Sequence, residues 1–160
     1  MKSIVFNVLF LCLSMVTSTH AKFDGTLDNV VACAKKYIGT KYSYGECGPE
    51  GMDCSCLMKV CFEENGISLE RMTVNQAKDG IDVKESDLKK GDLVFFDMND
   101  HGVIDHVGLV TENVNGAIIF IHASSSRGVI EVLLSDFWKS KYKKGVRVYL
   151  PEANPPTPVL

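Results

Sequence analysis

The sequence predicts an α+β domain in which helices come first and antiparallel strands follow. Up to Gly80, apolar residues recur at helical spacing, and the helical segments end near glycines. After Gly80, short apolar runs alternate with turn sequences, which is typical of strands joined by hairpins. A chain of 160 residues is expected to form a single folded domain.

Three helices are expected in the first half. The first ends at Gly39 and has one apolar face, made of Leu27, Val30, Val31, Ala34 and Ile38. A glycine-containing loop over 42–51 follows. The second helix begins after Asp53, a good N-cap, and runs to about Asn65. Its apolar face consists of Leu57, Met58, Cys61 and Phe62. A short third helix opens at Thr73, which forms a capping-box pattern with Gln76.

Five strands are expected in the second half, over residues 93–96, 106–111, 117–123, 129–134 and 146–150. Residues 113–116 carry the composition of a tight hairpin connection between the second and third of these strands. A helical turn is expected over 136–142. The last ten residues, 151–160, hold four of the five prolines and are predicted to form an extended or disordered tail.

The first 21 residues have the pattern of a secretory signal peptide. Lys2 precedes an almost wholly apolar run from Ile4 to Val16, and Ala21 provides a small residue for cleavage. A run of about 13 apolar residues is too short to span a bilayer of about 30 Å. We therefore expect a leader over 1–21, a catalytic domain over 22–150 and the tail, in a protein that is secreted or, alternatively, periplasmic.

Charge limits the expected partners. Only one of the 17 basic residues lies in the leader and none of the 20 acidic ones does, so the mature chain carries about −4. Phosphate binding needs concentrated positive charge. We interpret the basic cluster over 139–144 as a solvent-exposed face. We expect no binding to nucleic acid, none to membranes after leader cleavage, and a monomer in preference to an oligomer.

The cysteine count indicates a disulfide and a free thiol. Five cysteines remain after leader cleavage, and export favours an oxidising compartment. An odd number leaves at least one thiol unpaired, and this thiol is a candidate for chemistry. The spacing does not assign pairs among Cys33, Cys47, Cys56 and Cys61.

Three distant residues predict a nucleophilic site. Cys54 follows the N-cap of the second helix, where the helix dipole favours an anion and is expected to lower the pKa of the thiol. His106 opens an apolar strand and is the candidate general base. His122 lies within the next strand, where it is expected to hold the tautomer of His106 as the third member of a triad does. Neither a cofactor nor a metal is required.

Three rival interpretations remain open from the residues. Cys54 and Cys56 with the two histidines form a possible tetrahedral zinc set, although the spacing of the cysteines is tighter than in most zinc pairs. A catalytically silent binding module on the same fold is the second rival. The third is an acyltransferase or lipid hydrolase, but in such proteins the histidine tends to precede the cysteine, and this chain has the opposite order.

These residues resemble the NlpC/P60 family of cell-wall cysteine peptidases over most of the chain after the leader. The resemblance is carried, in family order, by Gly39-Thr40-Lys41-Tyr42-Ser43-Tyr44-Gly45, Gly51-Met52-Asp53-Cys54-Ser55, Leu69-Glu70-Arg71-Met72-Thr73 with Gln76, Leu88-Lys89-Lys90-Gly91-Asp92-Leu93-Val94-Phe95-Phe96, Asp105-His106-Val107-Gly108-Leu109 and Ile121-His122-Ala123-Ser124-Ser125.

The resemblance implies a papain-like α+β fold and hydrolysis of peptide bonds in bacterial peptidoglycan stems, usually between D-γ-glutamate and a diamino acid. Cys54 then matches the nucleophile, His106 the base and His122 the orienting residue. Two further matches, Asp53 and Ser55, imply a site for the free amine of the first stem residue. The biological role implied is wall remodelling or, in a secreted product, antibacterial activity.

Tyr42 matches a family tyrosine whose hydroxyl lies near the nucleophile, and Arg71 matches a family arginine without an assigned contact. The sequence also departs from the family pattern. Cys56 stands where glycine usually follows Asp-Cys-Ser, which invites crowding or a disulfide behind the nucleophile. The residues 112–117 lengthen the hairpin between the two histidines, which alters the rim of the cleft.

Overall fold

The computed structural model describes residues 26–148. The predicted leader over 1–21, the predicted tail over 151–160 and the predicted strand end at Leu150 lie outside the described residues. Within 26–148 no helix has both the length and the apolar character needed to cross a membrane.

The helices form where the apolar spacing places them. A first helix covers 26–36, and the chain leaves it through Gly39, whose φ of +91° suits glycine. Helix α2 (Cys54–Glu63) has Asp53 as its N-cap, and the predicted apolar face is buried. Gly66, with a φ of +77°, lies in the turn beyond it. Helix α3 is a single turn (Thr73–Gln76).

Strands β3 to β8 form a six-stranded antiparallel sheet in the order β3-β8-β4-β5-β6-β7. Their bounds are β3 Gly80–Val83, β4 Leu93–Phe96, β5 His106–Val114, β6 Ala117–Ser124, β7 Gly128–Leu133 and β8 Tyr142–Val148. A 3-10 turn (Glu85–Asp87) precedes β4, and helix α4 (Asp136–Lys141) precedes β8. The α+β class is confirmed.

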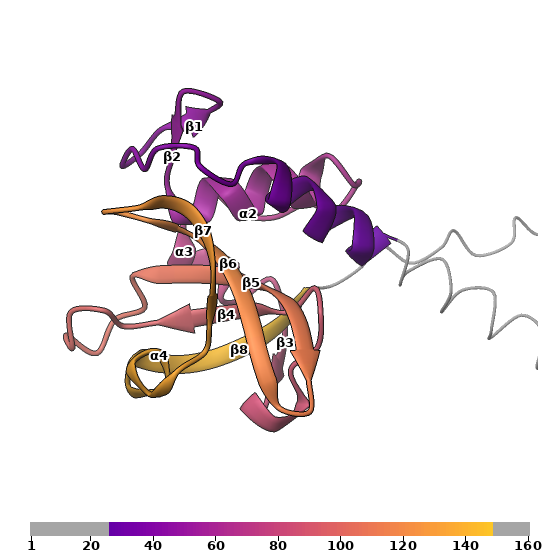
Figure 1. Ribbon diagram of the computed structural model, residues 1–160, viewed down its shortest axis with the longest axis vertical. Coiled ribbons are helices and arrows are strands. Elements are labelled where there is room, and N and C mark those ends of the chain that lie inside the picture. The colour runs from indigo at the N-terminus through magenta and orange to yellow at the C-terminus, as the bar shows by residue number, and fades with distance from the viewer. Residues whose placement is uncertain (1–25, 149–160) are drawn as a thin grey trace, which may run out of the picture.

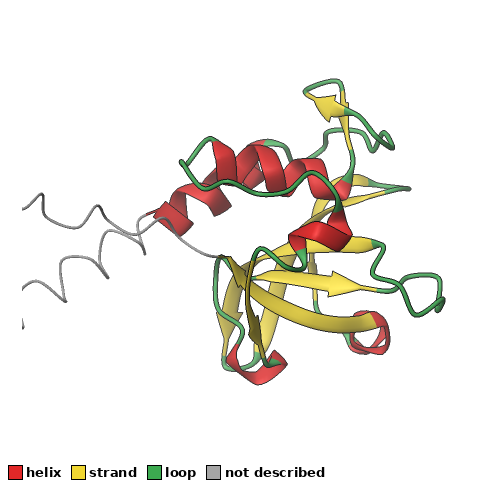
Figure 2. Ribbon diagram, turned by 180° about the vertical axis from the view of Figure 1, so that it is seen from behind, coloured by secondary structure: helices red, strands yellow, loops and turns green. Residues whose placement is uncertain are grey.

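Side chains that alternate along the strands divide the interior into two cores. On β4, Leu93 and Phe95 pack against the helices, whereas Val94 and Phe96 face the other side of the sheet. Helix 26–36 and α2 lie together over the first face, and α4 lies on the opposite side (Figure 1; Figure 2). The second core contains Phe120 and Trp138 as well.

The hairpin between β5 and β6 has the connection that the sequence predicts. Asn115 and Gly116 have φ values of +53° and +85°, as the two central residues of a type I′ turn require. Val114 pairs with Ala117 across this turn. The two histidine-bearing strands are therefore immediate neighbours in the sheet.

Four sequence-based expectations need correction. The sequence predicts no strand over 80–83, but β3 forms there at the edge of the sheet. It has only two apolar residues, so it depends on pairing with β8. Strand β8 begins at Tyr142, four residues earlier than predicted. The loop 42–51 contains a small hairpin, β1 (Cys47–Gly48) with β2 (Gly51–Met52). The capping box at α3 is absent, because Met72 is the N-cap and makes no side-chain capping bond.

Candidate active site

Cys54 is the first residue of α2 and carries a free thiol. Its sulfur lies beside the backbone N–H of Val107, the residue that follows His106 in the chain. The hydroxyl of Thr73 is 3.9 Å from the same sulfur. The side chain is 5% exposed. The first turn of the helix therefore presents the thiol to the start of strand β5.

His106 and His122 form a hydrogen-bonded pair. Nε2 of His106 is 2.8 Å from Nδ1 of His122, and the rings are nearly perpendicular at 88°. His106 is half-buried, and His122 is buried. Because Nε2 of His106 is engaged by His122, its Nδ1 is the nitrogen left for a reacting group. The structure thus brings together the two histidines that the sequence predicts as base and orienting residue.

Two adjoining hollows, of about 460 and 530 Å³, form a cleft around these residues. Cys54, Asp53 and Ser55 line the first hollow. The two histidines line the second. Tyr42, Tyr44 and Asp105 are shared by both hollows. The thiol and the imidazoles therefore lie in neighbouring parts of one cleft.

Burial keeps the Cys54 thiol and both imidazoles uncharged at physiological pH. It raises the pKa of the Cys54 thiol, and the charge of Asp53 adds to this effect. Burial lowers the pKa of His106 to about 4, and it lowers the pKa of His122 to about 3. The expectation of a lowered thiol pKa is therefore wrong. The Asp53 carboxylate accepts a hydrogen bond from the N–H of Cys56 and adds negative charge close to the thiol. This charge opposes the helix dipole, which was expected to favour the thiolate.

Asp53 is held by donors on both carboxylate oxygens. Arg71 donates to Oδ1 and Oδ2 at 2.9 and 2.6 Å, and the Ser55 hydroxyl donates to Oδ1 at 3.0 Å. The backbone N–H groups of Cys56 and Gly45 complete the set at 2.8 and 3.0 Å. Burial opposes ionisation, but Arg71 and the Cys56 N–H prevail and lower the pKa of Asp53. Arg71 also donates to Ser55 Oγ at 2.8 Å. These bonds occupy the lone pairs of the carboxylate.

Tyr42 lies close to the nucleophile. Its backbone forms an isolated parallel bridge with Met52, two residues before the start of α2. Burial raises the pKa of its hydroxyl, and Cys54 and Asp53 raise it further, which places both groups within electrostatic reach. The phenol is therefore a neutral hydrogen-bond donor in the cleft at neutral pH.

A disulfide joins Cys47 to Cys56, with 5.4 Å between their Cα atoms. It ties the β1–β2 hairpin to the first turn of α2 and settles one of the pairings that the sequence leaves open. Cys33 and Cys61 are free and buried. The bond also removes Cys56 from the rival zinc set, and no group of three or more candidate metal ligands occurs within residues 26–148.

Sequence reasoning missed Trp138, which stacks on His106 with ring centroids 5.9 Å apart and an interplanar angle of 21°. It also contacts His122 edge to face, with centroids 4.8 Å apart at 75°. Sequence reasoning also missed the contacts of Arg71 with Asp53. Both misses involve residues that are distant in sequence and meet only in the folded chain. The sole tryptophan of the chain, two residues into a predicted helical turn, was the only available signal.

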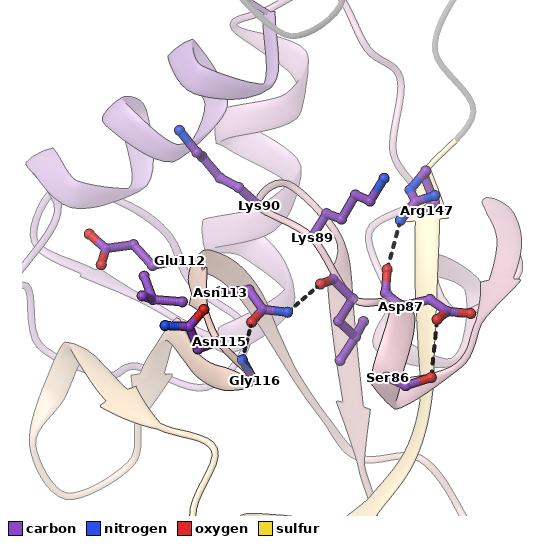
Figure 3. A pocket seen from close by; sticks show the side chains of 11 residues that line it. Ser86, Asp87, Lys89, Lys90, Glu112, Asn113, Asn115, Gly116 and Arg147 are labelled. Carbon is purple, nitrogen blue, oxygen red and sulfur yellow. Dashed lines mark hydrogen bonds between the residues drawn. The ribbon is translucent and has the colours of Figure 1, made fainter.

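Another hollow, larger than either of the two that form the cleft, lies between the β5–β6 hairpin and the segment before β4 (Figure 3). It has a volume of about 900 Å³ and contains neither cysteine nor histidine among its lining residues. Its polar groups bond to one another: Asn113 donates to the carbonyl of Leu88 at 2.7 Å and accepts from the N–H of Gly116 at 3.1 Å. The candidate nucleophile and its histidines therefore lie in the cleft around Cys54 and not in this hollow.

A free thiol at a helix start, beside a strand that begins with a neutral imidazole backed by a second imidazole, defines the site of a thiol hydrolase on an α+β domain. The model of the NlpC/P60 family matches residues 39–147. The chain belongs to the NlpC/P60 family.

Relatives and solved structures agree with this membership. The probable endopeptidase NlpC homolog of Haemophilus influenzae is 38% identical over 115 residues, which cover 71% of this chain and 58% of the relative. The murein DD-endopeptidase MepS/murein LD-carboxypeptidase of Escherichia coli K12 is 37% identical over 143 residues, covering 84% and 73%. The crystal structure of the NlpC/p60 domain of the peptidoglycan hydrolase SagA has a TM-score of 0.63 and 29% identity, covering 75% and 97%.

Proposed function

We propose that this protein is an exported cysteine hydrolase that cleaves peptide bonds in bacterial peptidoglycan stems, at the bond between D-γ-glutamate and a diamino acid. The observation that carries the proposal is the constellation of the Cys54 thiol, His106 and His122 in one cleft. The family supports the substrate class: among the relatives are a gamma-D-glutamyl-L-lysine dipeptidyl-peptidase and a gamma-DL-glutamyl hydrolase, both of Bacillus subtilis.

The neutral resting site defines the first step. The Cys54 thiol is protonated and His106 is unprotonated at neutral pH, so His106 acts as a general base. It takes the thiol proton as the sulfur attacks the scissile carbonyl carbon. This role requires the proton of His106 to lie on Nε2, from which it is donated to Nδ1 of His122 across the 2.8 Å contact between the two nitrogens.

The negative charge on the carbonyl oxygen needs donors near the start of α2. The N–H of Cys54 and the hydroxyl of Tyr42 are the groups proposed for this role, the latter because it is a neutral donor beside the sulfur. His106 then returns its proton to the leaving amine, which leaves a thioester on Cys54. Water attacks the thioester with His106 again as base and releases the carboxylic acid.

The two hollows suggest how the stem lies. The hollow with Asp53 and Ser55 is proposed to take the acyl side, with the free amine of the first stem residue. Because the lone pairs of Asp53 are already occupied, its contribution to an ammonium group is the local negative potential more than a new hydrogen bond. The hollow beyond the histidines then takes the diamino acid that leaves.

Purified stem peptides with a free amino terminus and a defined sequence test this proposal. Wild-type protein should release fragments that mass spectrometry assigns to cleavage after D-γ-glutamate, and Cys54→Ala should give no turnover while its far-UV circular dichroism stays unchanged. A metal chelator should leave the rate unchanged, and thiol alkylation should abolish it. Undiminished cleavage by Cys54→Ala would rule out the mechanism, and cleavage at another bond would rule out the proposed specificity.

A further inference from the structure

Trp138 contacts both imidazoles of the active site at once. Its ring is nearly parallel to that of His106 and nearly perpendicular to that of His122. Phe96 and Phe120 support the indole from behind, with ring centroids 4.9 and 5.0 Å away. The indole is 8% exposed. It is therefore a rigid wall on the histidine side of the cleft.

One nitrogen of the pair lacks a partner. For His106 to act as a base through Nδ1, its Nε2 must carry the proton that it donates to Nδ1 of His122. His122 must then carry its own proton on Nε2. Within the described part of the chain, this buried nitrogen has no hydrogen-bond partner. A buried N–H with no acceptor is costly, and the opposite tautomer would place a proton on the catalytic nitrogen.

We propose that Trp138 is a positioning residue, which fixes both imidazoles and offers its aromatic face to the Nε2–H of His122. An N–H group above an aromatic ring makes a weak hydrogen bond, and edge-to-face packing at a centroid distance of 4.8 Å suits this contact. The contact favours the tautomer of His122 that leaves Nδ1 of His106 free to accept the thiol proton. Stacking on His106 also restrains the orientation of that ring.

Conservative and disruptive variants separate this role from simple packing. Trp138→Phe keeps an aromatic face and should retain most of the activity, whereas Trp138→Leu fills part of the space without one. Trp138→Leu is expected to lose about tenfold or more in kcat with little change in KM. A matched control is Phe62→Leu, which removes a buried aromatic ring from the helix-side core and should lower stability without changing the pH profile of activity.

Imidazole NMR gives a readout that needs no substrate, so it remains decisive if the proposed function fails. The ¹⁵N shifts should show both histidines protonated on Nε2, and the Nε2 proton of His122 should be displaced upfield by the indole ring current. Trp138→Leu should abolish this displacement, and Trp138→Phe should keep part of it. A wild-type His122 protonated on Nδ1, or a proton shift that Trp138→Leu leaves unchanged, would overturn the proposal even if the leucine variant folds poorly.

A second observation concerns a cation in the same half of the cleft. Arg127 lies in the β6–β7 turn and lines the hollow that contains His122. Its charge contributes to the lowered pKa of His122, which places the guanidinium near the pair. Gly128 follows Arg127 with a φ of +71°, and a Cβ at this position would lie 2.3 Å from the carbonyl oxygen of Thr40. The turn therefore requires glycine here, and its backbone packs closely against Thr40. Among residues 26–148 no carboxylate forms an ion pair with Arg127.

We infer that Arg127 binds a carboxylate of the residue on the leaving side of the scissile bond. This inference rests on the proposed function and on the assignment of the diamino acid to this hollow. An unpaired guanidinium is suited to a carboxylate, and the hydroxyls of Ser124 and Ser126 in the same hollow offer further donors. The carboxylate has two possible sources: the side chain of meso-diaminopimelate, or the free α-carboxyl of a stem that ends at its third residue.

Four stems distinguish these sources: tripeptides and tetrapeptides with either meso-diaminopimelate or L-lysine at the third position. Arg127→Gln should lower kcat/KM by about 10- to 100-fold on the stems that carry the recognised carboxylate. A loss confined to both diaminopimelate stems identifies the side-chain carboxylate, and a loss confined to both tripeptides identifies the terminal one. Lys36→Gln removes an exposed charge remote from the cleft and should change none of the four rates.

An equal effect of Arg127→Gln on all four stems, or no effect on any, would overturn the inference while the wild-type rates still uphold the hydrolase. Wild-type protein that cleaves none of the four would instead remove the proposed function, and the inference with it. Arg127→Lys, which keeps the charge but loses the planar fork, should fall between Arg127→Gln and the wild type on the sensitive stems.

Discussion

His106 and His122 meet through a single hydrogen bond of 2.8 Å between Nε2 and Nδ1, with their rings at 88°. The residue behind the base is thus a neutral imidazole and not a carboxylate. A carboxylate would stabilise the protonated base, whereas a buried imidazole does not. The site therefore rests as a thiol beside a neutral histidine and forms charge only when substrate is attacked.

The pH dependence of kcat/KM should reflect this neutral resting state. Activity needs unprotonated His106, whose pKa is lowered to about 4, so activity should persist well below pH 6.5 and fall as the pH approaches 4. The raised thiol pKa predicts no loss of activity from thiol ionisation near neutrality. The profile of wild-type protein on a stem peptide with a free amino terminus checks this. An acid limb centred between pH 6 and 7 would contradict it.

Replacing His122 should separate orientation from charge. His122→Ala should lower kcat by about 10²-fold, less than His106→Ala, because it removes orientation and leaves the base. His122→Asp places a negative charge against Nε2 of His106 and should raise the pKa of that imidazole, which shifts the acid limb to higher pH. His122→Gln is the neutral control and should leave the limb near its wild-type position. A limb that does not move in His122→Asp would disprove the coupling.

The same two histidines should make the fold sensitive to acid. Both have pKa values lowered by burial, so the unfolded chain takes up protons from about pH 6.5 downward while the folded protein does not until about pH 4. The free energy of unfolding should therefore fall as the pH drops from 6.5 to 4. Urea unfolding across this range measures the fall. The double variant His106→Gln/His122→Gln should show a shallower fall, and an equal fall in both proteins would rule this cause out.

The Cys47–Cys56 disulfide should stabilise the fold and set the shape of the cleft. Its short loop predicts a loss of about 2–3 kcal/mol on reduction or in Cys47→Ser. Peptide mapping without reduction should find these two residues linked and Cys54 alkylated. Because Cys56 lies in the first turn of α2, loosening the hairpin should also raise KM. Mapping that finds Cys54 in a disulfide would contradict both the pairing and the mechanism.

The parts of this structure that local chemistry determines could be predicted from the sequence. Helix α2 with Asp53 at its start, the turn at Asn115 and Gly116, and strand β4 all form from signals within a few residues. The three candidate catalytic residues also stand in distinct local patterns, which is why the sequence alone is enough to propose them.

Features that depend on distant partners could not be predicted. Strand β3 forms because β8 pairs with it. The first residues of β8 include two lysines, which are not typical of a strand. One of them, Lys143, is accommodated by an ion pair with the carboxylate of Asp97 at 3.2 Å, which the sequence does not reveal. The direction of the Cys54 pKa depends on burial by the whole cleft, which a helix position alone does not reveal.

Arg71 is expected to hold the entrance of α2 in place through Asp53. The Asp53 side chain is 8% exposed, so Arg71→Met leaves a buried carboxylate without its cation. The Arg71 side chain is 35% exposed, so solvent screens part of the loss. The expected destabilisation is about 2–3 kcal/mol, below the 3–5 kcal/mol of a fully buried pair.

A double-mutant cycle isolates this interaction. Asp53→Asn should cost stability by itself, and Arg71→Met should cost much less in the Asp53→Asn background than in the wild type. Urea unfolding of the four proteins gives the coupling free energy, and Lys90→Met, which breaks an exposed pair with Asp28, is the matched control. Additive effects of the two changes would mean that Arg71 stabilises the fold through its other contacts, such as the bond to Ser55 Oγ, and not through Asp53.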